Sequence, residues 1–156
     1  MRLTDLLTPD AIVPSLKART KKQALQELSD KAAALSGLSS REIFDSLLQR
    51  ERLGSTGIGD GVAIPHGKMP RLKKICGVFA RLDRPVDFDS LDGAPVDLIF
   101  LLMAPESSGA DHLKALSCAA RMLRDAAIVA SVRATSDAAA IYSLIDRQAL
   151  SKPHAA

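Results

Sequence analysis

Residues 96–103 are nearly all apolar, and Asp97 is the only charged residue among them. A run of this length suits a β-strand and is far too short for a membrane helix, which needs about 20 apolar residues. A strand that is apolar on both faces has to be covered on both faces. We therefore expect this strand to lie inside a sheet that carries helices on each side.

Capping and turn residues place the other elements. Two capping boxes, residues 20–23 (TKKQ) and 39–42 (SSRE), predict helices that end at Gly37 and near Gly54. Asp111 is expected to cap a third helix that runs to about Leu123. Further helices are predicted over residues 126–132 and 137–147, a helical turn over 4–7, strands over 12–16, 62–64 and 75–82, and a turn at Asp92-Gly93.

Apolar residues at helical spacing predict the inward faces of the three longer helices. These faces hold Leu25, Leu28, Ala32 and Leu35 in the first helix, Ile43, Leu47 and Leu48 in the second, and Leu113, Leu116, Ala120 and Leu123 in the third. Helices before, between and after the strands indicate an α/β sandwich with a mixed central sheet. We expect one domain over residues 1–150 and a disordered tail over residues 151–156.

Composition narrows the classes of function. The net charge is +3, but basic residues are scattered and aromatic residues are only 3% with no Trp, which argues against nucleic-acid binding. We expect no secretory signal and no membrane insertion, because long apolar runs are lacking. Cys76 and Cys118 have apolar neighbours and are expected to be buried, reduced thiols. These features predict a cytoplasmic protein.

The segment of residues 54–68 is rich in glycine and holds Ser55, Thr56 and the triplet Pro65-His66-Gly67. Glycines let the backbone approach a ligand closely, and proline stiffens the chain before the histidine. A neutral imidazole is a nucleophile near neutral pH. His66 is therefore a candidate phosphoryl acceptor, and the alternative is a structural histidine at a strand end.

Other polar residues are candidates for binding a phosphoryl group, and each also has a purely structural alternative. His112 is expected at a helix N-terminus, where an anion is favoured, or it is simply a solvated first-turn residue. Arg50 or Arg52 could bind a phosphoryl group with paired N–H donors, or only complement a helix C-terminus. Ser55 and Thr56 are either loop caps or hydroxyl donors to the same oxygens. His154 is expected to be inert in the tail.

Three rival site types lack their motifs. The glycine segment has no Gly-Lys-Ser/Thr ending, so it is not a nucleotide-binding P-loop. The three histidines have no metal-ligand spacing, so no metal is expected. A GxSxG elbow is absent, which argues against a serine hydrolase.

Glu51 and residues 58–67 (IGDGVAIPHG) resemble the phosphorylation-site signature of the mannitol/fructose-type IIA domains of the bacterial sugar phosphotransferase system. The likeness extends from about Leu3 to about Asp146. Within the family it is greatest to the nitrogen-related regulatory branch, through residues 6–9 (LLTP) and 21–25 (KKQAL). The family fold is a mixed sheet between helices, in agreement with the pattern above.

The resemblance implies roles for individual residues. His66 would carry the phosphoryl group, and His112 and Arg50 would stabilise it. Ser55, Thr56, Gly57 and Gly67 would form the phosphoryl-binding loop. The chain would be a phosphotransferase component, a phosphohistidine carrier rather than a multi-turnover enzyme, with no cofactor.

The resemblance also implies partners. The phosphoryl donor would be an HPr-like phosphocarrier protein, and the regulatory targets would be proteins such as potassium transporters or sensor kinases. One alternative is a sugar-specific IIA component, for fructose or mannitol, that passes phosphate to a IIB domain. Another is a pure binding module without phosphoryl transfer.

Overall fold

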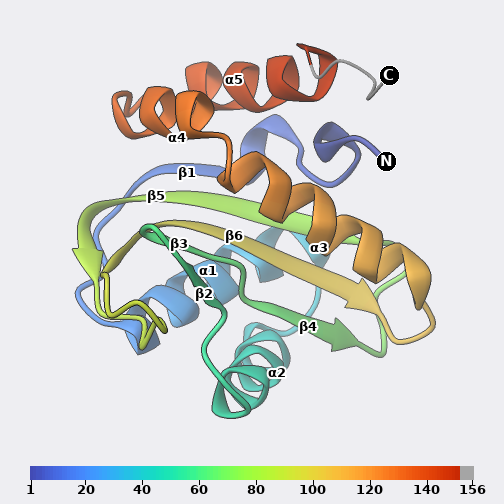
Figure 1. Cartoon of the computed structure of the whole chain (residues 1–156). Helices are drawn as coiled ribbons and strands as arrows, with labels where there is room; N and C mark the ends of the chain where they lie inside the picture. The colour runs from blue at the N-terminus through green and yellow to red at the C-terminus, as the bar shows by residue number, and fades with distance from the viewer. Residues whose placement is uncertain (152–156) are drawn as a thin grey trace.

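The computed structural model describes residues 1–151, so residues 152–156 of the predicted tail lie outside the described part. Figure 1 shows the arrangement of the elements. In chain order these are η1 (Leu3–Asp5), η2 (Pro9–Ala11), β1 (Ile12–Leu16), α1 (Lys21–Ser36), α2 (Ser40–Arg52), β2 (Gly57–Gly59), β3 (Val62–Ala63), β4 (His66–Met69), β5 (Cys76–Val86), β6 (Val96–Pro105), α3 (Ala110–Leu123), α4 (Ala126–Arg133) and α5 (Ala138–Ser151).

The sheet has six strands in residues 1–151, in the order β1-β5-β6-β3-β2, with β4 paired to β6. β5 is antiparallel to β6, whereas β3 and β4 are parallel to it. β3 pairs with Leu98 and Ile99, and β4 pairs with β6 from Leu102 onward. The chain therefore follows one edge of β6 twice, with a break at Ile64 and Pro65 between the two short strands.

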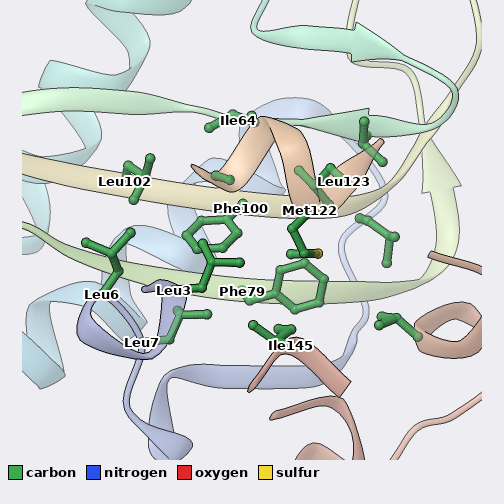
Figure 2. Close-up of a cluster of buried hydrophobic side chains, with 14 of the residues drawn as sticks. Leu3, Leu6, Leu7, Ile64, Phe79, Phe100, Leu102, Met122, Leu123 and Ile145 are labelled. Carbon is green, nitrogen blue, oxygen red and sulfur yellow. The ribbon is translucent and has the colours of Figure 1, made fainter. Parts of the chain in front are cut away.

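β6 is the central strand that the apolar run predicts, and it separates two hydrophobic clusters. Leu98, Phe100 and Leu102 face one cluster, and Ile99 and Leu101 face the other. Figure 2 shows the first cluster, in which the Phe79 and Phe100 rings meet edge to face with centroids 6.0 Å apart. Alternation along a buried strand thus builds a core on each face of the sheet.

Each cluster is closed by its own layer of helices. α3, α4 and α5 contribute buried residues to the first cluster, and α1 and α2 contribute them to the second. The two groups of helices lie on opposite sides of the sheet in Figure 1. The predicted fold class, a mixed sheet flanked by helices, is confirmed.

The predicted capping residues of the first two helices are confirmed. Thr20 accepts from the Gln23 amide at 3.1 Å, and Ser39 accepts from the Glu42 amide at 3.3 Å. Gly37 ends α1 in the left-handed conformation with φ of 79°. Caps satisfy backbone groups that a helix terminus leaves free, so they fix where each helix begins and ends.

The prediction for the third helix is wrong in its cap and right only in part in its inward face: Leu123 is buried, and Leu116 and Ala120 pack against the first cluster. Gly109, not Asp111, is the N-cap, and α3 buries His112, Ala115 and Ala119. Leu113 is 67% exposed. Two neighbouring rows of apolar residues follow this helix, and the row with small alanines lets the helix approach the bulky side chains of β6 closely.

Two smaller predictions also need correction. Leu35 lines an open surface cavity in the last turn of α1 and is 39% exposed. Cys76 and Cys118 are half-buried rather than buried, and burial raises the pKa of the Cys76 thiol. Ser151 is the last residue of α5, and the rest of the predicted tail, residues 152–156, lies outside the described residues.

Candidate functional site

His66 is the first residue of β4, immediately after Pro65. It lies opposite Leu102 of β6, and the Leu102 amide donates to the Pro65 carbonyl at 2.9 Å. Directly opposite residues of a sheet share a face, so the imidazole points toward the layer that contains α3. The sheet therefore holds the backbone of the histidine while its half-buried ring stays accessible at the edge.

The partners of the ring nitrogens define the tautomer of His66. Nδ1 lies 2.8 Å from the Ile64 carbonyl oxygen, which can only accept, so Nδ1 carries the proton. Nε2 is then the nitrogen with the free lone pair. Arg50 donates from Nε to this nitrogen at 3.3 Å. The ring is thus fixed from both ends, with its nucleophilic nitrogen beside a guanidinium group.

Arg50 belongs to the last turn of α2, on the face of the sheet opposite α3. Its Nη1 donates to the Gly54 carbonyl at 2.8 Å, which anchors the guanidinium while Nε reaches the imidazole. Arg52 is exposed. Of the two arginines that the sequence left open, the structure brings Arg50 to His66.

His112 reaches the same place from the other helical layer. It lies in the first turn of α3, as expected, and its ring meets that of His66 edge to face, with centroids 5.5 Å apart and an interplanar angle of 66°. The side chain is buried, and its Nε2 has no hydrogen-bond partner. An unpaired buried polar atom is costly, so this nitrogen is prepared for a partner that the free protein lacks.

Both imidazoles favour the neutral form. Burial lowers the pKa of His66, and the nearby Arg50 charge lowers it further, against opposing effects of the Ile64 carbonyl and of Glu51. Burial also lowers the pKa of His112, with added repulsion from His66 and Lys68. A neutral ring is nucleophilic, and the cations that keep it neutral also attract an anion.

The hydroxyls of Ser55 and Thr56 are not brought to the imidazole. Ser55 Oγ donates to the Phe88 carbonyl at 2.6 Å and accepts from the Gly57 amide at 3.1 Å. The Thr56 hydroxyl and amide both donate to the carboxylate of Glu51. These groups hold the loop in shape, which favours the loop-cap reading over direct donation to a phosphoryl group.

Two of the predicted loop glycines lie in close contact with serine side chains. A Cβ on Gly57 would lie 2.1 Å from Ser90 Oγ, and one on Gly67 would lie 2.4 Å from Ser46 Oγ. Ser46 of α2 also donates to the Lys68 carbonyl at 3.3 Å. Gly67 thus allows α2 to lie directly against β4, which places Arg50 beside His66.

Glu51 is a site residue to which the sequence analysis gave no role. Its side chain is only 2% exposed, and Lys21 contacts it at 2.9 Å. The signal was present in the sequence, since Glu51 follows Ile43 and Leu47 at helical spacing and so occupies a position on the buried face of α2.

Two further observations concern metal ions and membranes. Within residues 1–151, no cluster of three or more His, Cys, Asp or Glu residues is arranged to hold a metal ion. The helices of this part of the chain are all too short or too polar to cross a bilayer.

Comparison with known proteins identifies the class. Residues 5–148 match the family described as phosphoenolpyruvate-dependent sugar phosphotransferase system, EIIA 2. The chain therefore belongs to the EIIA type-2 family of phosphotransferase components.

Within that family, several similar proteins are nitrogen regulatory proteins, and sugar-specific EIIABC components also match. One from Bradyrhizobium diazoefficiens is 63% identical over 145 residues, which cover 93% of this chain and 95% of that protein. Another from Klebsiella oxytoca is 39% identical over 93% of this chain and 90% of that protein. The crystal structure of the nitrogen regulatory protein IIA-Ntr from Neisseria meningitidis aligns with a TM-score of 0.87 and 37% identity, over 92% of this chain and 98% of that one.

Proposed function

We propose that this protein accepts a phosphoryl group on Nε2 of His66 from an HPr-like phosphocarrier in the cytoplasm. Its phosphorylated and free forms would then contact different regulatory proteins. One observation carries the assignment of the acceptor: Nδ1–H donates to the Ile64 carbonyl, so the unprotonated Nε2 and its lone pair lie beside Arg50. A nucleophile held in one tautomer by its second nitrogen is the arrangement that this chemistry needs.

The proposed transfer is a direct exchange between two imidazoles. The Nε2 lone pair of His66 forms the new N–P bond while the N–P bond of the donor phosphohistidine breaks, and the donor imidazole leaves with the bonding electron pair. Negative charge on the equatorial oxygens is stabilised by Arg50, whose Nη1 stays on the Gly54 carbonyl while Nε turns toward an oxygen. Since both bonds are N–P bonds to imidazole, the exchange is expected to be nearly balanced and reversible.

His112 has a role in the phosphorylated form. Its buried, unpaired Nε2 lies on the ring that contacts His66, so a phosphoryl oxygen on His66 would give it the missing partner. A neutral imidazole can donate one N–H to such an oxygen. This role predicts that His112 prolongs the life of the adduct rather than choosing the residue that is modified.

The test is incubation with the purified phosphocarrier chain and phosphoenolpyruvate, read by intact mass. Wild type should gain one phosphoryl group, and His66→Ala should gain none. The adduct should be labile in acid and stable in base, as expected for an N–P bond. A mass gain on the His66→Ala variant, or an acid-stable adduct, would contradict the assignment of His66.

The same preparation separates the alternatives. Phosphorylated protein mixed with a fructose- or mannitol-type IIB domain should keep its phosphoryl group, because the chain is 63% and 39% identical to nitrogen regulatory proteins and 36% identical to a fructose-specific component. Rapid transfer to IIB would favour a sugar-specific component. A wild-type protein that never gains the mass would favour a pure binding module.

A further inference from the structure

Glu51 is a charged residue inside the core-facing surface of α2. Its carboxylate has three donors: Lys21 Nζ at 2.9 Å, the Thr56 amide at 3.0 Å and the Thr56 hydroxyl. A buried carboxylate is tolerated only when it is paired and hydrogen-bonded, and this one satisfies both conditions. A leucine at this position would fill the space more cheaply, so the stability of the fold alone does not explain the charge.

Lys21, the partner of Glu51, is also largely buried. It is the first residue of α1, and its side chain is only 18% exposed. Its ammonium lies 4.8 Å from the centroid of the Phe88 ring, and the Phe88 carbonyl accepts from Ser55. Lys21 thus touches both the carboxylate of Glu51 and the segment that holds the beginning of the glycine loop.

A continuous series of hydrogen bonds leads from this pair to the imidazole. The Thr56 amide is held by Glu51, and the Thr56 carbonyl accepts from the Ile64 amide at 3.0 Å. The Ile64 carbonyl in turn accepts a hydrogen bond from Nδ1–H of His66, with Nδ1 and the oxygen 2.8 Å apart. Each bond in this series connects to the next, so the carboxylate contributes, together with the sheet pairing on either side of Ile64, to the position of the Ile64 carbonyl.

The other nitrogen of His66 depends on the same residue. Arg50, which donates to Nε2, immediately precedes Glu51 in the last turn of α2. Glu51 fastens this turn to Thr56, and Thr56 leads to the Ile64 carbonyl. One carboxylate therefore links the group that orients Nδ1 to the group that faces Nε2.

We propose that Lys21 and Glu51 form a positioning pair that holds the His66 imidazole in its Nδ1–H tautomer, with Nε2 free for phosphoryl transfer. This inference rests on the proposed function only for its kinetic consequence. Neither residue touches the reacting atoms. Both act through Thr56 and Ile64.

The test compares Glu51→Gln, Lys21→Met and Lys21→Arg with wild type, and uses Lys22→Met as the matched control, since Lys22 is the exposed neighbour in α1. Glutamine keeps the size of Glu51 and one acceptor oxygen but removes the negative charge. Methionine removes the positive charge of Lys21, whereas arginine keeps it. Three quantities are measured: the rate of phosphoryl transfer from the phosphocarrier, the ¹⁵N chemical shifts of the His66 ring, and the thermal midpoint. A misplaced nucleophile typically costs up to about 10²-fold in rate.

We expect Glu51→Gln and Lys21→Met to transfer about tenfold more slowly or worse, and their ¹⁵N shifts to show a mixture of tautomers. Lys21→Arg should recover part of both losses, and Lys22→Met should match wild type. Folded variants with wild-type rates and wild-type ¹⁵N shifts would overturn the inference, as would a rate loss without any change of tautomer. If Glu51→Gln does not fold, the two Lys21 variants decide.

Failure of the proposed function has a different signature. Wild type would then gain no phosphoryl mass at all, while the ¹⁵N shifts would still report whether Lys21 and Glu51 fix the tautomer. The two outcomes are therefore read from different measurements on the same samples.

Discussion

Arg50 donates its Nε–H to Nε2 of His66, the nitrogen that has no proton of its own. This bond links α2 to the edge of the sheet and occupies the lone pair that we propose as the nucleophile. Reaction requires the guanidinium to exchange one acceptor, a ring nitrogen, for another, a phosphoryl oxygen. Because Nη1 stays on the Gly54 carbonyl, the exchange needs only a small rotation of the side chain.

Arg50→Ala should slow phosphoryl transfer by about 10²-fold, the usual loss for one preorganised donor to transition-state charge. Binding of the phosphocarrier should change much less, because the group acts on the transferring phosphoryl. Single-turnover rates measured over a range of carrier concentrations separate the two effects. Arg52→Ala is the control, since Arg52 is exposed, and equal losses in both variants would indicate long-range steering only.

His112→Leu should raise the stability of the unphosphorylated protein by about 1 kcal/mol, because it removes a buried nitrogen that has no partner. The same variant should still be phosphorylated on His66 but lose the phosphoryl group faster. Urea unfolding and adduct lifetime, measured in one buffer, give the two quantities. An adduct as long-lived as that of wild type would show that His112 does not contact the phosphoryl group.

The pH dependence follows from the lowered pKa values of His66 and His112. The unfolded chain binds protons near the ordinary histidine value of about 6.5, and the folded protein binds them only at lower pH. The free energy of unfolding should therefore be unaffected by these groups above about pH 7.5 and should fall as pH drops through 6.5.

NMR titration of the two imidazoles checks this sign directly, and both midpoints should lie below that of a free histidine. Arg50→Ala should move the His66 midpoint upward, because the guanidinium is one of the groups that lower this pKa. A His66 midpoint above the free value would contradict the burial argument, because burial is the main cause of the lowered pKa.

Gly67→Ala should destabilise the protein by about 1–3 kcal/mol, the usual range for overpacking, because the new methyl group meets Ser46 Oγ at 2.4 Å. The cost should be smaller in a Ser46→Ala background, where the hydroxyl is gone. A double-mutant cycle in urea isolates the coupling between the two positions. Additive effects would show that α2 and β4 do not depend on this contact.

Much of the fold was visible in the sequence because the deciding signals are local. Thr20 and Ser39 cap the helices that they were predicted to cap, and the apolar run became β6. β2 and β4 were missed because glycine and Pro65 are usually signs of a turn, whereas here pairing of β2 with β3 and of β4 with β6 holds these segments extended. The inward face of α3 was predicted only in part, because two adjacent rows are apolar and only the shape of the sheet chooses between them.

The sequence predicted the central residues of the site but not their contacts and hydrogen-bond partners. His66 stood out through its neighbours, but its contact with His112 joins distant parts of the chain, and no local pattern encodes it. The hydroxyls of Ser55 and Thr56 were plausible donors to a ligand until the structure showed their carbonyl and carboxylate acceptors. Hydrogen-bond partners depend on tertiary placement, which spacing along the chain does not give.

The place of β4 at the rim of the sheet has a consequence for how other proteins can approach it. A free strand edge is a template on which a foreign strand can add, and proteins guard such edges with short length, proline and charge. β4 follows Pro65, ends after four residues, carries Lys68, and gives one of its carbonyls to Ser46. A protein that binds here therefore contacts side chains rather than free backbone groups of β4. Its contact with His66 can form and dissociate without the addition of a strand to the sheet, which is the process that leads to aggregation.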